Sequence, residues 1–433
     1  MALAPSAASN PDGQAPGFDS DHIDAPELRG FVMALFFIFG GITSLNDVII
    51  PKLKDLFTLD NTQAMLVQTA FFAAYAIIGI PGAAIVKRVG YMRGAAIGLL
   101  TMMAGCILFI PASNSATFAL FLAALFVLAS GVVIVQVVAN PLISLLGPAL
   151  TAGSRLTFAQ AFNSLGTTVF PYVGAIVMLG ALAHVKASDL SGAQLDAYRV
   201  AATQAVVHSY LGLALVLAIV AAVVLANRNR LKGEHHDHSS VLKSFDLLGR
   251  PRFGYGALCI FLYVGAEVAI GSMIVFYMRQ SHVLGLSEQA AGTLIPLYWG
   301  GALIGRFIGS AVLRVVDPAK VLIFNTVGAI ALIAITTHTT GHVAAGSLLA
   351  IGLFNSIMFP TIFTLACDGL GERAADGSGV ICVAIVGGAV IPPLTGKLQD
   401  LTGSWGLALI LPAACYAIIA GFGWFARARR QSV

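Results

Sequence analysis

Two carboxylates interrupt apolar segments that are otherwise almost free of charge. Asp47 follows Asn46 in "SLNDVIIP", and Glu267 lies in "YVGAEVAIGS". A charged group at bilayer depth costs several kcal/mol, so an ionisable residue within a membrane segment indicates function. Burial favours the neutral form of a carboxyl group, which suits a group that loads and releases a proton. The structural alternatives are a helix cap near Pro51 for Asp47 and a bond between helices for Glu267.

Four carboxamides form two pairs, each on one face of a helix. Gln136 and Asn140 are four residues apart, and Gln160 and Asn163, in "FAQAFNSLG", are three apart. Carboxamides both donate and accept hydrogen bonds, so they suit a ligand made of hydroxyl groups. Such residues also join membrane helices without binding any ligand. Two pairs in one half of the chain favour the ligand site.

Two further residues extend this candidate site. Trp299 falls in the middle of the apolar stretch "PLYWGGALIGR", where a flat ring can cover the apolar face of a sugar, although packing explains it equally well. Asn355 adds a carboxamide in a later segment. The residues expected to bind substrate are Gln136, Asn140, Gln160, Asn163, Glu267, Trp299 and Asn355.

Charged residues near the ends of apolar segments predict a conformational role. We expect Arg306 to join Arg314 and Asp317 in a cluster that holds one end of the second half together. Basic residues of the first half are expected to do the same. The complete predicted cluster is Lys87, Arg88, Arg93, Arg306, Arg314 and Asp317.

A frame of membrane helices must position these residues. Of the 433 residues, 58% are hydrophobic and 10% charged, whereas soluble domains carry about 25% charged residues. Twelve apolar stretches recur between residues 30 and 426. Each is about 20 residues long or somewhat longer, and about 20 residues suffice for a helix to cross a bilayer. Lipid leaves backbone groups no other partners, so these stretches are predicted to be helices. The expected fold class is an all-α membrane protein with twelve transmembrane helices.

The polar segment 227–252 divides the stretches six and six. It predicts two six-helix bundles, at residues 30–226 and 253–426, with a disordered tail at 1–29 and a short tail at 427–433. Lysines and arginines concentrate in the loops on the side of both tails, which places both tails in the cytoplasm. Pro141 and Pro360 recur at similar places in the two halves, as in transporters built from repeats with a substrate site between them.

Other kinds of chemistry find little support in the sequence. The five cysteines stand singly, without a CxxC pair, and the net charge of +4 follows from the basic loops rather than from nucleic-acid binding. We expect residues 227–252 to be a solvated cytoplasmic linker, although the composition of its cluster His235–His238 also fits a metal site. We find no nucleophile–base pair or phosphate loop, so we expect no enzyme. We expect a monomer in the lipid bilayer, with no metal and no cofactor besides the coupling proton.

Several stretches resemble the fucose–galactose–glucose proton symporters of the major facilitator superfamily. They are "LNDVIIP" at 45–51, "ANP" at 139–141, "AQAFNSLG" at 159–166, "YVGAEVAIGS" at 263–272, "GRFIGS" at 305–310 and "FNSIMFPTIF" at 354–363. The resemblance implies a major facilitator fold and proton-driven uptake of a monosaccharide by alternating access. It assigns Asp47 to proton translocation and sugar binding, and Gln160 and Asn163 to sugar contacts.

One position departs from the fucose transporter. Where that protein has a membrane glutamate in its fourth helix, this chain has Gln136, which cannot titrate. Together with Glu267, this looks more like the glucose/galactose branch. We predict import of a hexose, glucose or galactose, across the bacterial inner membrane, coupled to protons through Asp47 and Glu267. The alternatives are a facilitative sugar carrier without proton coupling and a transporter of another small polyol-like solute.

Overall fold

The described part of the chain is built of helices. The structure is a computed structural model that describes residues 28–57, 61–114, 117–179, 192–228 and 241–430, and its regular secondary structure in these ranges is entirely helical. The first half contains α1 (Leu28–Phe57), α2 (Asn61–Val89), α3 (Tyr91–Asn114), α4 (Phe118–Leu145), η1 (Ala149–Thr151), α5 (Ala152–Leu179) and α6 (Ala193–Ala226). The second half contains η3 (Val241–Gly249), α7 (Pro251–Met278), α8 (Glu288–Gly292), α9 (Ile295–Val312), α10 (Pro318–His338), α11 (Gly341–Asn355), α12 (Met358–Cys367), η4 (Gly371–Arg373), α13 (Ala374–Ala384), α14 (Gly387–Thr402), α15 (Trp405–Ala408) and α16 (Ile410–Arg430).

The described helices provide twelve segments of membrane length. Ten are long and apolar enough to cross a bilayer, and three of these consist of two consecutive helices: α11 with α12, α13 with α14, and α15 with α16. The other two are α5, with 28 residues, and α9, whose 18 residues extend about 27 Å. The prediction of an all-α membrane protein is confirmed.

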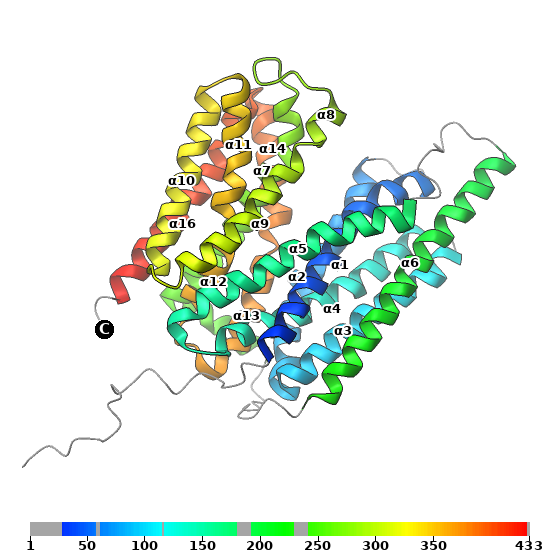
Figure 1. The fold of residues 1–433 in the computed structure, drawn as a ribbon, viewed down its shortest axis with the longest axis horizontal. Helices are drawn as coiled ribbons and strands as arrows, with labels where there is room; N and C mark the ends of the chain where they lie inside the picture. Colours follow the sequence, from blue (N-terminus) through cyan, green and yellow to red (C-terminus); the bar gives the residue numbers. More distant parts are fainter. Residues whose placement is uncertain (1–27, 58–60, 115–116, 180–191, 229–240, 431–433) are drawn as a thin grey trace, which may run out of the picture.

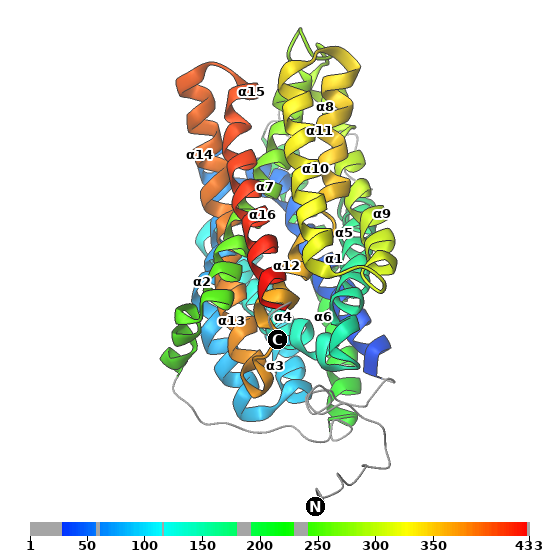
Figure 2. The ribbon, with the colours of Figure 1, turned by 90° about the vertical axis from the view of Figure 1, so that its left-hand side faces the viewer.

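The helices form two bundles that meet chiefly along two pairs of helices. Figure 1 shows α1–α6 in one bundle and α7–α16 in the other. Between the bundles, α2 packs against α13, and α5 packs against α9. The bundles spread apart toward the end at which α8 lies, and the view in Figure 2 places α8 and α15 together at that end of the second bundle. We call the opposite end, which carries Lys87 and Arg373, the basic end.

The segment between the bundles is partly helical. α6 ends at Ala226, as expected, while α7 begins at Pro251 rather than at 253. Residues 229–240 lie outside the described residues, and with them the His235–His238 cluster. The helix η3 then packs against α2, α7 and α13. The second part of this segment therefore touches both bundles, which the prediction of a solvated linker did not include.

A pair of glycines brings α2 and α13 into close contact. A Cβ atom on Gly79 would lie 2.7 Å from the carbonyl oxygen of Gly379, and one on Gly379 would lie 2.6 Å from the Cβ of Ala83. Both distances are shorter than non-bonded atoms tolerate. Small residues are a common means of packing membrane helices, because lipid tails offer no hydrophobic force to drive association. The close contact between the bundles therefore requires glycine, which has no side chain, at both positions.

Near this contact, a buried carboxylate joins three elements. Asp376, in the first turn of α13, accepts hydrogen bonds from Lys87 Nζ at 3.1 Å and from Ser244 Oγ of η3 at 2.8 Å. Arg373 Nε donates to the same carboxylate at 3.2 Å and also grips Asp246 with both terminal nitrogens. We call these five residues the Asp376 cluster. It links the end of α2, the segment between the bundles and the start of α13.

Helix dipoles add to the stability of this cluster. Lys87 lies in the last turn of α2, where the helix carries partial negative charge, and Asp376 lies in the first turn of α13, where the charge is positive. The Arg373 guanidinium holds the pKa of the exposed Asp246 below its usual range. A carboxyl group whose pKa is lowered on folding stabilises the folded state at pH values above its unfolded pKa of about 4. This stabilisation is lost as the pH falls through the lower pKa of the folded state. The pair of Arg373 and Asp246 is therefore intact at neutral pH.

Replacing Gly379 by alanine tests the glycine contact. Gly379→Ala should lower the free energy of unfolding by about 1–3 kcal/mol, because the new methyl group collides with the backbone of α2. Gly212→Ala in α6 is the control, since nothing lies within 4 Å of a Cβ at that position. It should leave stability unchanged or slightly raised. Thermal unfolding of the purified protein measures both, and equal midpoints for the two variants would contradict the role of the contact.

Neutralising Asp376 tests the cluster. Asp376→Asn removes the counter-charge of an ion pair whose two side chains are 7% and 3% exposed, and breaking a buried pair from one side costs about 3–5 kcal/mol. Asp246→Asn is the control, because that exposed carboxylate is screened by solvent. We expect a marked loss of thermal stability for the first and a small one for the second. A loss of equal size in both would show that burial of the ion pair is unimportant.

Candidate functional site

Glu267 lies within a buried hydrogen-bond network of the second bundle. Its Oε1 lies 2.8 Å from the hydroxyl of Tyr263, one turn earlier on α7, and the same hydroxyl lies 3.0 Å from the carbonyl oxygen of Asn355. That carbonyl ends α11, where no residue of the helix remains to donate to it. A tyrosine hydroxyl has one proton, so it can donate to only one of these two acceptors at full strength.

Two more tyrosines close the network around Asn355. Tyr416 donates to Oδ1 of Asn355 at 2.7 Å, and Nδ2 of Asn355 donates to the Tyr298 hydroxyl at 2.8 Å. The Tyr298 hydroxyl in turn lies 3.2 Å from the main-chain oxygen of Glu267. Asn355 has no exposed surface, and its amide is already bonded to protein on both atoms. In this conformation it therefore positions α7, α9 and α16 around Glu267, and it is not placed as the sugar ligand that the sequence predicted.

Arg306 connects this network to the first bundle. Pro360 has no N–H, so the carbonyl of Ser356, four residues earlier, lacks a helical donor. Arg306 Nε supplies one at 3.3 Å, and Nη1 donates across the interface to the main-chain oxygen of Gln160 at 3.4 Å. Arg306 is also the cation that acts electrostatically on Glu267. It lies with Glu267 and Gln160 rather than in the expected cluster with Arg314 and Asp317.

The first bundle brings the four predicted carboxamides onto α4 and α5. Gln136 donates to the Tyr75 hydroxyl of α2 at 3.1 Å, and Asn163 donates to the carbonyl oxygen of Phe36 in α1 at 3.4 Å. Gln160 is almost buried. Asn140 is 1% exposed, and its Oδ1 has no hydrogen-bond partner among the described residues. A buried acceptor without a donor is costly, so a water molecule or a ligand hydroxyl is the chemistry that this position suits.

Close packing of α1 and α5 sets the position of the predicted proton carrier. A Cβ on Gly40 would lie 2.5 Å from Nδ2 of Asn163, so only glycine allows α1 to approach this amide. Asp47 follows seven residues later, about 10 Å further along α1. The side chain of Asp47 lies outside the described residues.

Trp299, in α9 of the second bundle, is partly packed and partly exposed. Its ring meets that of Tyr298 edge to face, with 5.1 Å between the centroids, and a Cβ on Gly271 of α7 would lie 3.3 Å from the indole. The side chain is 43% exposed. It thus packs against the tyrosine network on one side and leaves ring surface open on the other.

The residues of the predicted charge cluster occupy different surroundings. Lys87 and Arg306 form hydrogen bonds to the opposite bundle. Asp317 instead caps α10, accepting from the backbone nitrogens of Ala319 and Lys320. The remaining members are exposed; they are Arg88, Arg93 and Arg314.

Several of the predicted site residues have partners that the sequence did not predict. Tyr263 stands four residues before Glu267, a spacing that places both on one helix face and gave a usable signal. Arg373 and Asp376 have a similar spacing of three at the start of an apolar run. Tyr75 and Tyr416 carry no such signal, because they reach Gln136 and Asn355 from distant helices.

Comparisons with known proteins agree with this architecture. The model of the Major Facilitator Superfamily matches residues 32–391. A glucose/galactose transporter of Brucella abortus is 48% identical over 390 residues, covering 90% of this chain and 91% of that protein. The L-fucose-proton symporter of Escherichia coli K12 is 32% identical over 416 residues, covering 93% and 95%.

A solved structure shows the same arrangement of helices. The crystal structure of FucP, a transporter of this superfamily described in the outward conformation, superimposes with a TM-score of 0.84 at 31% identity and covers 92% of this chain and 98% of that one. These relatives are named transporters, not enzymes. Since the family model spans most of the sequence and relatives align over nine-tenths of it, this chain belongs to the Major Facilitator Superfamily.

Proposed function

We propose that this protein is a secondary active transporter that imports a hexose, glucose or galactose, together with protons. The relatives named a glucose/galactose transporter and an L-fucose-proton symporter support a sugar substrate and proton coupling. The observation that carries the proposal is the placement of Glu267. It is a carboxylate within a membrane helix, bonded to a hydroxyl with two competing acceptors and acted on by an arginine that reaches the other bundle.

The conformation fits an outward-facing state. We infer that the basic end faces the cytoplasm of a bacterial inner membrane, because lysines and arginines concentrate there. The bundles meet at that end through the Asp376 cluster and spread apart at the other. The solved relative with the same fold is described in the outward conformation. The substrate would then enter from outside, between the bundles.

We assign the sugar contacts chiefly to the first bundle. Gln136, Asn140, Gln160 and Asn163 offer donors and acceptors to hydroxyl groups, and the unpaired Oδ1 of Asn140 gives one acceptor that is ready to bind. Trp299 supplies an open aromatic surface from the second bundle. Asp47 is the first proton carrier in this proposal. Its protonation would neutralise the site and favour sugar binding from outside.

Glu267 is the second proton site in this proposal, because its protonation changes the number of hydrogen bonds around it. When ionised, Glu267 accepts the single proton of the Tyr263 hydroxyl, and the Asn355 carbonyl loses a full donor. When protonated, Glu267 donates to Tyr263, which then donates to Asn355. Protonation therefore completes a chain of bonds from α7 to the end of α11, and it removes the charge that attracts Arg306. Release of Arg306 would loosen the contact with Gln160 on α5.

A facilitative carrier is the second candidate. Gln136 stands on the helix where the fucose transporter has a membrane glutamate, and a carboxamide cannot carry a proton. In that case Asp47 and Glu267 would bind sugar without moving protons, and sugar uptake would not acidify the vesicle interior.

Uptake of labelled glucose and galactose into proteoliposomes under an imposed pH gradient tests the proposal. Asp47→Asn should abolish accumulation driven by the gradient, because the carboxamide cannot titrate. Asn46→Ala is the matched control, one residue and about 100° around the same helix. Competition by other monosaccharides in the same assay measures the sugar preference. Wild-type rates and pH dependence in Asp47→Asn would exclude Asp47 as the carrier.

Glu267→Gln separates proton coupling from sugar binding. Glutamine can donate to Tyr263 as a protonated carboxyl does, so the variant should still exchange sugar across the membrane at equilibrium. It should fail to accumulate sugar against a gradient. Asp368→Asn, which neutralises a carboxylate paired with Arg252 outside this network, should accumulate sugar like the wild type. Full accumulation by Glu267→Gln would eliminate Glu267 from the coupling.

A further inference from the structure

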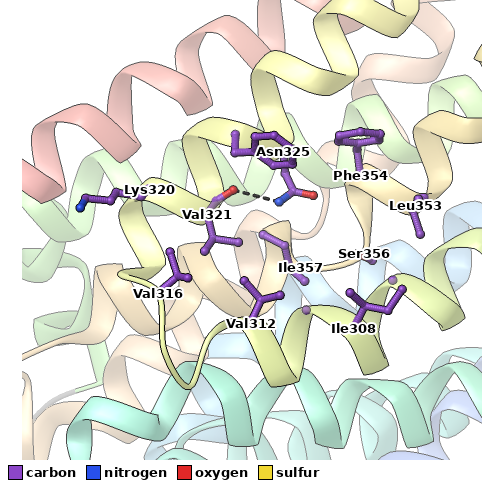
Figure 3. Close-up of a pocket in the computed structure, with 13 residues that line it drawn as sticks. Ile308, Val312, Val316, Lys320, Val321, Asn325, Leu353, Phe354, Ser356 and Ile357 are labelled. Carbon is purple, nitrogen blue, oxygen red and sulfur yellow. Dashed lines mark hydrogen bonds between the residues drawn. The ribbon is translucent and has the colours of Figure 1, made fainter.

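A long apolar groove opens on the second bundle, and none of its lining residues belongs to the candidate sugar site. It lies between α9, α10 and the junction of α11 with α12, and its volume is about 420 Å³. Figure 3 places Lys320 at one end and Leu353 at the other, with Asn325 between them. The volume falls in the range of sites that bind small molecules.

The groove has a buried floor and an exposed rim. Val321 and Ile357 belong to a small apolar cluster of their own at its base. Ile308 and Phe324 form the rim and are 56% and 69% exposed. Gly305 and Gly309 let α9 pack closely on the junction of α11 with α12, because a Cβ on Gly309 would collide with Ile357. An apolar chain therefore fits over the buried floor, between the exposed rim residues.

Positive charge lies at the basic end of the groove. Lys320, in the first turn of α10, lines it, and Arg314 is exposed in the preceding turn. The carboxylate of the intervening Asp317 is directed to the backbone of α10, where its Oδ1 accepts from Ala319 and Lys320. Lysine and arginine at helix ends extend toward the membrane surface, where they attract anionic headgroups.

Asn325 adds a polar group part-way along the groove. One N–H of its amide bonds to the carbonyl of Val321 at 2.9 Å, and the amide has a second N–H to offer. Asn325 lies five residues after Lys320, about 7.5 Å deeper along α10. That order of a cation, a hydrogen-bond donor and then an apolar wall matches the order of phosphate, ester carbonyl and acyl chain in a glycerophospholipid.

We propose that this groove binds one anionic glycerophospholipid from the leaflet at the basic end. The phosphate contacts Lys320 and Arg314, an ester oxygen meets Asn325, and one acyl chain lies over Val321 and Ile357. The groove shares Ser356 with the hydrogen bond of Arg306, so the lipid supports the wall of α9 and α12 behind that contact.

Native mass spectrometry of the purified full-length protein in detergent tests the charge recognition. Dioleoyl phosphatidylglycerol is the anionic probe, and dioleoyl phosphatidylcholine, with the same chains, is the zwitterionic one. We expect a single tight phosphatidylglycerol molecule, with Lys320→Ala weakening it about fivefold and Lys320→Arg restoring it. Arg228→Ala, an exposed cation at the basic end of the first bundle, should leave binding unchanged. Equal affinity for the two lipids, or an equal loss in Arg228→Ala, would overturn the proposal.

A groove-filling variant tests the location of the acyl chain. Leu353→Trp places a bulky ring on the groove wall while keeping Lys320, and it should remove the tight lipid. Val343→Trp alters an exposed position near the start of the same helix, outside the groove, and should retain the lipid. Thermal unfolding shows whether each variant is folded. Retention of lipid by folded Leu353→Trp would show that the lipid binds outside the groove. A wild-type dimer without lipid would show that a second copy of the chain covers the groove instead, and either result overturns the proposal.

Discussion

The absence of water in the bilayer is the constraint on which this structure depends. Every polar group within a span must find its partner in the protein, because lipid tails offer none. Pro360 removes one helical donor, and the Ser356 carbonyl that it leaves takes Arg306 instead. Arg306 then reaches the first bundle through Gln160. A single proline thus creates the acceptor that places an arginine between the two halves and beside Glu267.

The same constraint distinguishes two carboxylates of the second bundle, Asp376 and Glu267. Asp376 at the basic end has two cations and a serine hydroxyl within hydrogen-bond distance, so its charge is fully compensated and its role is structural. Among the described residues, Glu267 has one hydrogen-bond donor, the Tyr263 hydroxyl, and the Asn355 carbonyl competes for the same proton. A carboxylate with too few donors can exchange a proton with less disturbance than one held by several. The proposed division between a fixed joint and a proton site follows from the number of donors.

The fold was largely predictable, and the site only in part. Long apolar runs and the basic loops sufficed for the helices and for the division into two halves, because bilayer thickness and backbone bonding allow no other regular solution for such runs. The segment between the halves was different. Its second part looks like a linker in the sequence, and the contacts of Ser244 with Asp376 and of Asp246 with Arg373 explain the position of η3. The residues Glu267, Asn140 and Gln160 were found because polar side chains are rare in such spans.

The sequence by itself determined which residues are costly to bury, and therefore which deserve a functional explanation. Only the tertiary structure decided which partners each of them meets. In the structure, the amide of Asn355 is bonded to Tyr298 and Tyr416, and Oδ1 of Asn140 has no donor among the described residues. Arg306 lies at the interface between the bundles, whereas the sequence predicted it in a charged cluster at one end. Periodicity fixes the face of one helix, whereas partners such as Tyr75 and Tyr416 come from helices far away in the chain. Hydrogen bonding between distant helices depends on their packing, which local spacing does not encode.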